Sequence, residues 1–146
     1  MLRGRAPATV DAKGRVKIPA HYRQLIEEKC GRDFYVTSTD GLVALLYPLP
    51  VWLEIEQRLV AQANSRPSVK KFKSRLSYYG ATTAMDRQGR VLIPAHLRQS
   101  ARLENEVILL GQLDYLEIWN RKQLDERIDS QALTDEDLKV LADLGF

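Results

Sequence analysis

DAKGRVKIPAHYR at residues 11–23 and DRQGRVLIPAHLR at residues 86–98 are two copies of one motif. They carry the same amino acid at nine of thirteen positions, 75 residues apart. After each copy the chain continues in the same order, with an apolar run, a turn, a second apolar run and a helix-like stretch. A repeat of this kind predicts two structural units of the same design.

The motif begins with a tight turn. Asp11 and Gly14 in the first copy, and Asp86 and Gly89 in the second, form D-x-x-G. An Asp side chain accepts hydrogen bonds from backbone amides two residues on, and Gly tolerates the positive φ that a tight hairpin requires. We therefore assign a turn-forming role to these four residues.

The residues after the turn predict a strand and then a helix. Apolar and basic residues alternate over 15–18, which is typical of a strand with one buried face, and the apolar half of this pattern recurs at 91 and 93. Pro19 and Pro94 suit the first position of the following helix, where the missing N–H costs nothing. Each unit thus reads as strand, turn, strand, short helix, second strand pair and closing helix.

Composition limits the class of protein. The chain has 146 residues, of which 45% are hydrophobic and 28% charged, as expected of a globular protein with a real core. Cys30 is the single cysteine and only two histidines accompany it, so we expect a reducing cytoplasm, no disulfide and no metal site. No apolar stretch in the sequence suits a signal peptide or a membrane span.

Charge is unevenly distributed along the chain, although the net charge is only +3. Residues 1–23 hold six bases and one acid, whereas residues 104–146 hold eleven acids and four bases. The lysine-rich stretch at 69–79 is either a solvated helix face or a surface for phosphate contact or subunit docking. The acidic end either shields the basic face or solvates a docking helix, and we favour the second.

These features predict four segments. Residues 5–50 form the first unit, 51–80 a helical connector, 81–124 the second unit and 125–146 an acidic C-terminal helical tail. We expect no catalytic residue, because the sequence holds no G-x-S-x-G, P-loop, G-x-G-x-x-G or H-E-x-x-H motif. The protein is therefore predicted not to be an enzyme and to need no cofactor.

Arg15 and Arg90 follow the two turns, and two roles are open for them. A two-stranded ribbon fits the major groove of B-DNA, and Arg bonds guanine or phosphate well. Alternatively, the two arginines pair with Asp11 and Asp86 and only brace the turns. Both roles can hold in part.

The repeated D-x-x-G-R-V-x-I-P-x-x-x-R, with LLYPLPVW at 45–52 and VILLGQLDYLEIW at 107–119, strongly resembles the bacterial MraZ family of transcriptional regulators. The resemblance implies an α+β, mainly β fold, in which two AbrB-like (SpoVT-AbrB) swapped-hairpin half units form one interleaved β-core, a pseudo-dimer with flanking helices. It also implies ring-like homo-oligomers that bind short direct repeats upstream of their own operon of cell-wall and division genes and repress it.

The family's DNA-contacting element maps onto residues 11–15, with Arg15 as the principal candidate and Lys13 and Arg3 beside it, and again onto residues 86–90. The first copy is the more cationic, so we expect it to make most of the contacts with the ligand and the second copy to contribute less. Leu92 suits a contact between subunits. The predicted DNA-binding residues are Arg3, Lys13, Gly14, Arg15, Lys17, Arg87 and Arg90.

The sequence thus predicts a cytoplasmic, nucleoid-associated repressor whose partners are double-stranded DNA and further copies of itself. No membrane and no small-molecule substrate is expected. The alternative is a protein-interaction or assembly module of AbrB type, in which the arginines close subunit salt bridges.

Overall fold

The computed structural model describes residues 1–62 and 66–146, so residues 63–65 of the predicted connector lie outside the described residues. The first half of the chain contains β1 (Arg5–Thr9), β2 (Arg15–Lys17), α1 (Ala20–Cys30), β3 (Asp33–Thr37), β4 (Ala44–Pro48) and α2 (Leu49–Ala61). The second half contains α3 (Pro67–Tyr79), β5 (Ala81–Ala84), β6 (Arg90–Leu92), α4 (Ala95–Ala101), β7 (Glu106–Gly111), β8 (Leu116–Asn120), α5 (Arg121–Ser130) and α6 (Asp135–Asp143).

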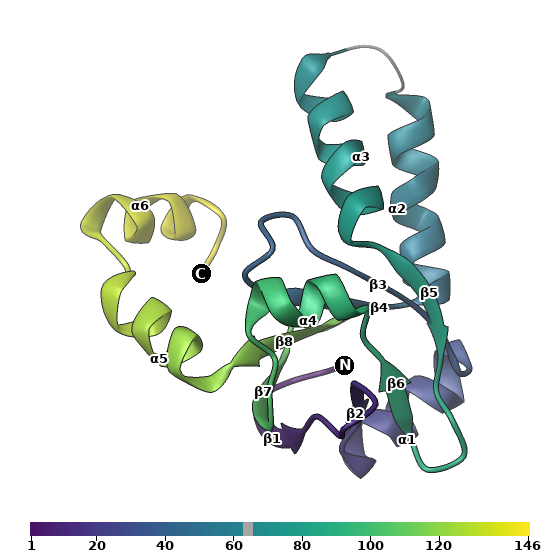
Figure 1. The fold of residues 1–146 in the computed structure, drawn as a ribbon. Helices are drawn as coiled ribbons and strands as arrows, with labels where there is room; N and C mark the ends of the chain where they lie inside the picture. Colours follow the sequence, from purple (N-terminus) through teal and green to yellow (C-terminus); the bar gives the residue numbers. More distant parts are fainter. Residues whose placement is uncertain (63–65) are drawn as a thin grey trace.

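Strands from both copies combine in one antiparallel sheet. Its order is β1-β7-β8-β4-β3-β5, so the first strand of each copy pairs with the third strand of the other copy. The fourth strands, β4 and β8, pair at the centre (Figure 1). The mixed α+β class with a mainly antiparallel sheet is confirmed.

The motif strands form a separate two-stranded ribbon, and here one expectation was wrong. We predicted that the strands on either side of each turn pair with one another. Instead β2 pairs with β6, its counterpart in the other copy. The two sides of the first turn are joined by the Val10–Val16 bridge and by a hydrogen bond from the Asp11 amide to the Arg15 carbonyl at 2.9 Å. The reason is that β1 is paired with β7, which leaves β2 to find its partner in the second copy.

The core lies between this ribbon and one face of the sheet. Val16, Ile18, Val91 and Ile93 are completely buried, which confirms the predicted alternation along the motif. Side chains of α1 and α4 close this core from the ends of the ribbon. Burial of each large aliphatic side chain contributes about 1.5–3 kcal/mol, so the most identical part of the repeat is also a main source of stability.

Helices α1 and α4, which begin inside the two copies of the motif, start one residue later than predicted. Pro19 and Pro94 precede the first helical residue and do not occupy it. The Pro19 carbonyl accepts hydrogen bonds from the amides of Tyr22 and Arg23, at 3.1 and 3.0 Å. Pro19 and Pro94 are therefore the N-cap residues of α1 and α4.

The other face of the sheet is covered by α2 and α5. Leu124 of α5 packs with Ile108 and Trp119, while Trp52 of α2 stacks on Tyr35 of β3 with ring centroids 4.4 Å apart. The buried Thr37 hydroxyl donates to the Leu76 carbonyl at 2.7 Å and so ties α3 to β3. None of the helices within the described residues combines the length and the apolar character needed to cross a membrane.

Candidate nucleic-acid interface

The first turn is organised by the carboxylate of Asp11. Its Oδ1 atom accepts hydrogen bonds from the amides of Lys13 at 3.0 Å and Arg15 at 2.9 Å, and its Oδ2 atom accepts one from Arg15 Nε at 2.7 Å. Gly14 has a φ of +85° and donates its amide to the Asp11 carbonyl. These bonds fix the shape of the turn at Asp11 and Gly14.

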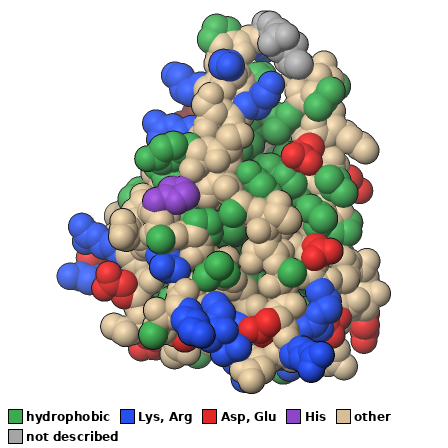
Figure 2. All heavy atoms as spheres, turned by 45° about the vertical axis from the view of Figure 1, so that its right-hand side comes forward, with side chains coloured by type: hydrophobic (Ala, Val, Ile, Leu, Met, Phe, Trp, Pro, Cys, Tyr) green, Lys and Arg blue, Asp and Glu red, His purple; other side chains and the backbone are tan. Residues whose placement is uncertain are grey.

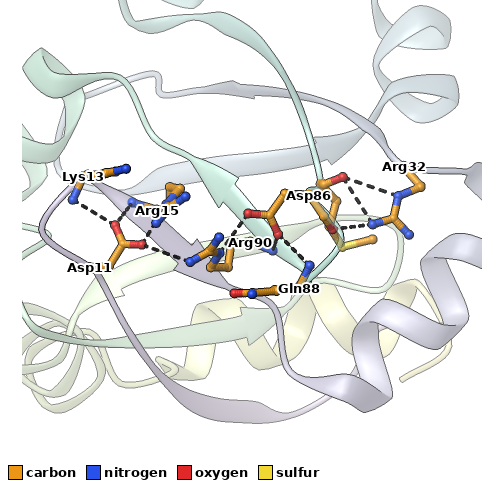
Figure 3. A network of polar contacts seen from close by, with 8 residues as sticks. Asp11, Lys13, Arg15, Arg32, Asp86, Gln88 and Arg90 are labelled. Atoms are coloured by element: carbon orange, nitrogen blue, oxygen red, sulfur yellow. Dashed lines mark hydrogen bonds and ion pairs between the residues drawn. The ribbon is translucent and has the colours of Figure 1, made fainter.

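The second turn repeats this geometry. Asp86 Oδ1 accepts from the amides of Gln88 and Arg90, both at 2.9 Å, and Asp86 Oδ2 accepts from Arg90 Nε at 2.8 Å. Gly89 has a φ of +76°. Figure 3 shows the two turns side by side, joined by the contact of Arg90 with Asp11.

These bonds hold both aspartates in the ionised form. The Arg15 amide is the main cause of a pKa of Asp11 below its ordinary value of 3.8, and it outweighs the opposing effect of burial. The Arg90 amide lowers the pKa of Asp86 in the same way. Charge-assisted bonds of this kind are short and directional, so each arginine is fixed in one orientation at neutral pH.

The two arginines brace the turns and remain accessible. Each uses Nε for its own aspartate, and the side chains of Arg15 and Arg90 keep 27% and 26% of their surface exposed. Arg90 Nη1 also lies 3.8 Å from Asp11 Oδ2, which links the two copies. The bracing contacts therefore exist, and they leave the outer edge of each guanidinium available for a ligand.

Lys17 and Leu92 extend the same outer face of the ribbon. Lys17 stands opposite Arg90 and Leu92 stands opposite Arg15 in the register, and both are exposed. Lys13 and Arg87 are exposed in the two turns. The structure thus brings together all predicted DNA-binding residues except Arg3.

Arg3 lies apart from this surface, contrary to the expectation that it stands beside Lys13. It precedes β1, whereas the turn follows β1, and five extended residues span about 17 Å. Its carbonyl accepts a hydrogen bond from the Tyr22 hydroxyl at 2.9 Å. Nearness in sequence was misleading here because β1 is fully extended along β7.

Two residues that the sequence did not indicate support the turns from the opposite copy. A Cβ atom on Gly14 would lie 1.3 Å from Nη1 of Arg98, and one on Gly89 would lie 2.2 Å from Nη1 of Arg23. Arg98 Nη1 also donates to the Ile93 carbonyl at 3.0 Å. Both arginines are the last residue of the repeated motif, and that identity was the available signal.

Arg32 is a third residue that the sequence did not reveal. Its guanidinium donates to the carbonyls of Met85 and Asp86 and pairs with Glu27 at 2.7 Å. It therefore clamps the start of the second turn from the first copy. No distinctive pattern surrounds Arg32 in the sequence. It reaches the second turn because β3, which follows Arg32, pairs with β5 of the other copy.

The histidines of the motif take part in local contacts. The His96 ring lies 2.7 Å from the Tyr78 carbonyl through Nε2, and the His21 ring packs on Tyr22. Among the residues that the structure describes, no three His, Cys, Asp or Glu side chains are grouped in a way that could hold a metal ion.

Comparison with known proteins places the repeat in a family. A family model described as "MraZ protein, putative antitoxin-like" matches residues 79–138. The chain is 43% identical over 146 residues to Transcriptional regulator MraZ of Acidobacterium capsulatum, with both chains covered completely. The chain belongs to the MraZ family. The same coverage holds for the MraZ proteins of Koribacter versatilis, at 42% identity, and Haemophilus influenzae, at 36%.

Membership of the MraZ family confirms the resemblance seen in the motif. The full-length matches include both copies of the repeat, whereas the family model spans the second copy and the helices that follow it. These relatives are named transcriptional regulators.

Proposed function

We propose that the protein is a sequence-specific DNA-binding transcriptional regulator that represses its own cluster of division and cell-wall genes. The observation that carries this proposal is the pair of aspartate-oriented arginines, Arg15 and Arg90, on the outer face of a two-stranded ribbon. Membership of a family whose members are named transcriptional regulators supports it.

The ribbon is suited to the major groove of B-DNA, which admits two antiparallel strands. Because Nε of each arginine is bound to an aspartate, the terminal nitrogens of Arg15 are oriented for guanine O6 and N7 or for a phosphate. Arg90 offers mainly Nη2, since its Nη1 also lies 3.8 Å from Asp11 Oδ2. Little side-chain freedom is then lost on binding, which favours affinity.

Two lysines and one further arginine supply contacts to the DNA backbone in this proposal. Lys13, Lys17 and Arg87 are exposed around the ribbon and would neutralise phosphates. The first copy carries the greater part of the binding, because Lys13 and Lys17 have the uncharged counterparts Gln88 and Leu92 in the second copy. No catalytic step and no cofactor belongs to this function.

Self-association completes the proposal. We infer that the two halves are AbrB-type swapped-hairpin units and that copies of the chain form a ring whose turns contact successive direct repeats. Linking several weak contacts raises the effective concentration, so binding becomes strong where the repeat spacing fits. The protein would act in the cytoplasm, on the nucleoid.

The test measures binding of the wild type and Arg15→Ala to DNA from upstream of the gene, at two salt concentrations, with the oligomer mass recorded in parallel. Arg121→Ala is a matched control, because it also removes one exposed, ion-paired arginine that is not part of the ribbon strands. We expect salt-sensitive binding that Arg15→Ala loses while its mass is unchanged. No binding by the wild type refutes the proposal.

An assembly module of AbrB type is the second candidate, and the antitoxin-like description of the family model favours keeping it. In that case the arginines hold subunits together. Arg15→Ala would then dissociate the oligomer at protein concentrations where the wild type and Arg121→Ala remain assembled.

A further inference from the structure

The outer face of the β2–β6 ribbon carries four side chains, and three of them are basic. Val16 and Val91 are completely buried. Since neighbouring residues of a strand point to opposite faces, the residues on either side of these valines point outward. They are Arg15, Lys17, Arg90 and Leu92. Figure 2 shows Lys and Arg side chains gathered at the lower end of the molecule, where Figure 1 places β2 and β6. Leu92 is thus the one apolar side chain among the four.

Leu92 packs on little of its own chain. It keeps 51% of its surface exposed and belongs to neither of the hydrophobic clusters that the described residues form. In the register it lies directly opposite Arg15. Single exposed leucines are common on protein surfaces. This one differs because the proposed function places its face in the major groove of DNA, where the side chain meets base edges instead of water.

Leu92 also marks the point where the outer face departs from symmetry. The central residue pair of the ribbon lies on a pseudo-two-fold axis, because exchange of the two copies places Arg15 on Arg90 and Lys17 on Leu92. Two-fold symmetry in a protein matches two-fold symmetry in its DNA site. The arginines keep this symmetry, whereas the lysine and the leucine break it. The outer face therefore has a direction, which suits a DNA site whose two halves differ.

The major groove offers one apolar group to such a leucine. Among the base edges only thymine presents a methyl group there, and apolar side chains recognise it by contact. Side chains directly opposite in an antiparallel pair lie about 4.5–5.5 Å apart, and successive base pairs are about 3.4 Å apart along the helix. Leu92 would therefore reach a base one or two pairs away from the position that Arg15 contacts.

We propose that Leu92 contacts the 5-methyl group of a thymine one or two base pairs from the position bound by Arg15. The inference rests on the proposed function and identifies a base that the same ribbon reads. It gives Leu92 a different task from the contact between subunits that the sequence suggested. A second copy that placed the same face here would bring three cations against three cations, which is unfavourable.

DNA without thymine methyl groups tests the contact. A duplex from upstream of the gene is synthesised with deoxyuridine in place of thymidine, which removes the methyl group and leaves the O4 acceptor. Fluorescence anisotropy compares the thymine and uracil duplexes for the wild type and Leu92→Ala. Leu53→Ala is the matched control, because Leu53 is 47% exposed and belongs to α2. Light scattering records the oligomer mass, and circular dichroism checks the fold.

We expect the wild type to bind the uracil duplex at least about fourfold more weakly than the thymine duplex, equivalent to about 0.8 kcal/mol for one buried methyl group. Leu92→Ala should bind the thymine duplex more weakly than the wild type does, and it should lose little more on the uracil duplex because the contact is already absent. The control should behave as the wild type does. Any change in DNA stiffness affects all three proteins alike, so the difference between them isolates the contact.

Leu92→Lys separates base recognition from charge. This variant places at position 92 the residue type of its counterpart Lys17, so its affinity should be kept or raised by a new phosphate contact. The salt dependence should steepen by about 0.9 in log–log slope for each phosphate gained. Its preference for the thymine duplex should fall to that of Leu92→Ala, since the ammonium group does not replace the apolar contact.

The outcomes separate this inference from the proposed function. If the wild type binds both duplexes equally, the methyl contact is wrong while DNA binding stands. An equal loss on the uracil duplex for the wild type and Leu92→Ala also overturns it, because another group then senses the methyl. A lower oligomer mass for Leu92→Ala overturns it in favour of a contact between subunits. Absence of binding by the wild type to the thymine duplex refutes the proposed function itself.

Discussion

Replacing Gly14 by Ala tests whether the two copies really hold each other's turns. The new Cβ atom would lie 1.3 Å from Nη1 and 2.1 Å from Cζ of Arg98, so this side chain must leave its position. The Arg98 hydrogen bond to the Ile93 carbonyl is then lost, which costs about 1–3 kcal/mol for a charged donor at a partly exposed site. The φ of +85° adds about 1–2 kcal/mol for any residue with a side chain.

We therefore expect Gly14→Ala to lower the free energy of unfolding by about 2–5 kcal/mol. Gly4→Ala is the matched control, because Gly4 has a φ of +78° and no described atom lies within 4 Å of its added Cβ. This control should lose only the backbone contribution, about 1–2 kcal/mol. Urea denaturation measures both losses of stability. An unchanged m-value shows that the surface exposed on unfolding is the same as in the wild type.

The double variant Gly14→Ala/Arg98→Ala isolates the contact. If Arg98 occupies the space above Gly14, the double variant is less destabilised than the sum of the two single variants, because the clash disappears with the guanidinium. Equal losses for Gly14→Ala and Gly4→Ala, or strictly additive losses in the double variant, would refute the reasoning. The strand exchange would then not couple the turns through Arg98.

Three further predictions concern Arg15, the two turn aspartates and Thr37. Arg15→Lys keeps the charge but loses the planar fork, so affinity for the operator should fall by about 5- to 150-fold in fluorescence anisotropy, with an unchanged circular dichroism spectrum. The pKa values of Asp11 and Asp86 are lowered in the folded state, so their ionised carboxylates contribute their full stabilisation above pH 3.8. This contribution is lost as the pH falls through the lower folded-state pKa values. The melting temperature of Asp11→Asn/Asp86→Asn should therefore fall less steeply than that of the wild type when thermal unfolding is followed from pH 6 to 2. Thr37→Val removes the buried donor to the Leu76 carbonyl and should cost about 1–3 kcal/mol in urea denaturation, whereas the same change at the exposed Thr39 should cost little.

The local structure of the motif could be predicted from the sequence because its causes are local. The Asp11 turn depends on atoms within four residues, and the burial of Val16 and Ile18 follows from alternation along one strand. The pairing of β2 with β6 depends on residues 75 apart, and no local property of either strand distinguishes it from pairing across the turn.

The same argument explains which residues of the candidate site the sequence indicated. Arg15 was identified because it follows a recognisable turn in its own copy. Arg98 and Arg32 act on turns of the opposite copy, so their roles become visible only once the strands are exchanged. The position of Arg3 was predicted wrongly for the complementary reason, since a neighbour in sequence lies at the far end of a strand.

The exchange also explains how the two copies differ. Positions where they agree include the Asp and Gly of the turns, the buried Val and Ile, and the arginines that reach across, all of which maintain the shared ribbon. Three of the four positions where they differ, residues 12, 13 and 17 against 87, 88 and 92, are exposed. Arg98 of the second copy supports the first turn. The second copy therefore needs this arginine even though its own turn and strand carry fewer bases than those of the first copy. In the proposed function it therefore serves as the support for the first copy's contact with DNA.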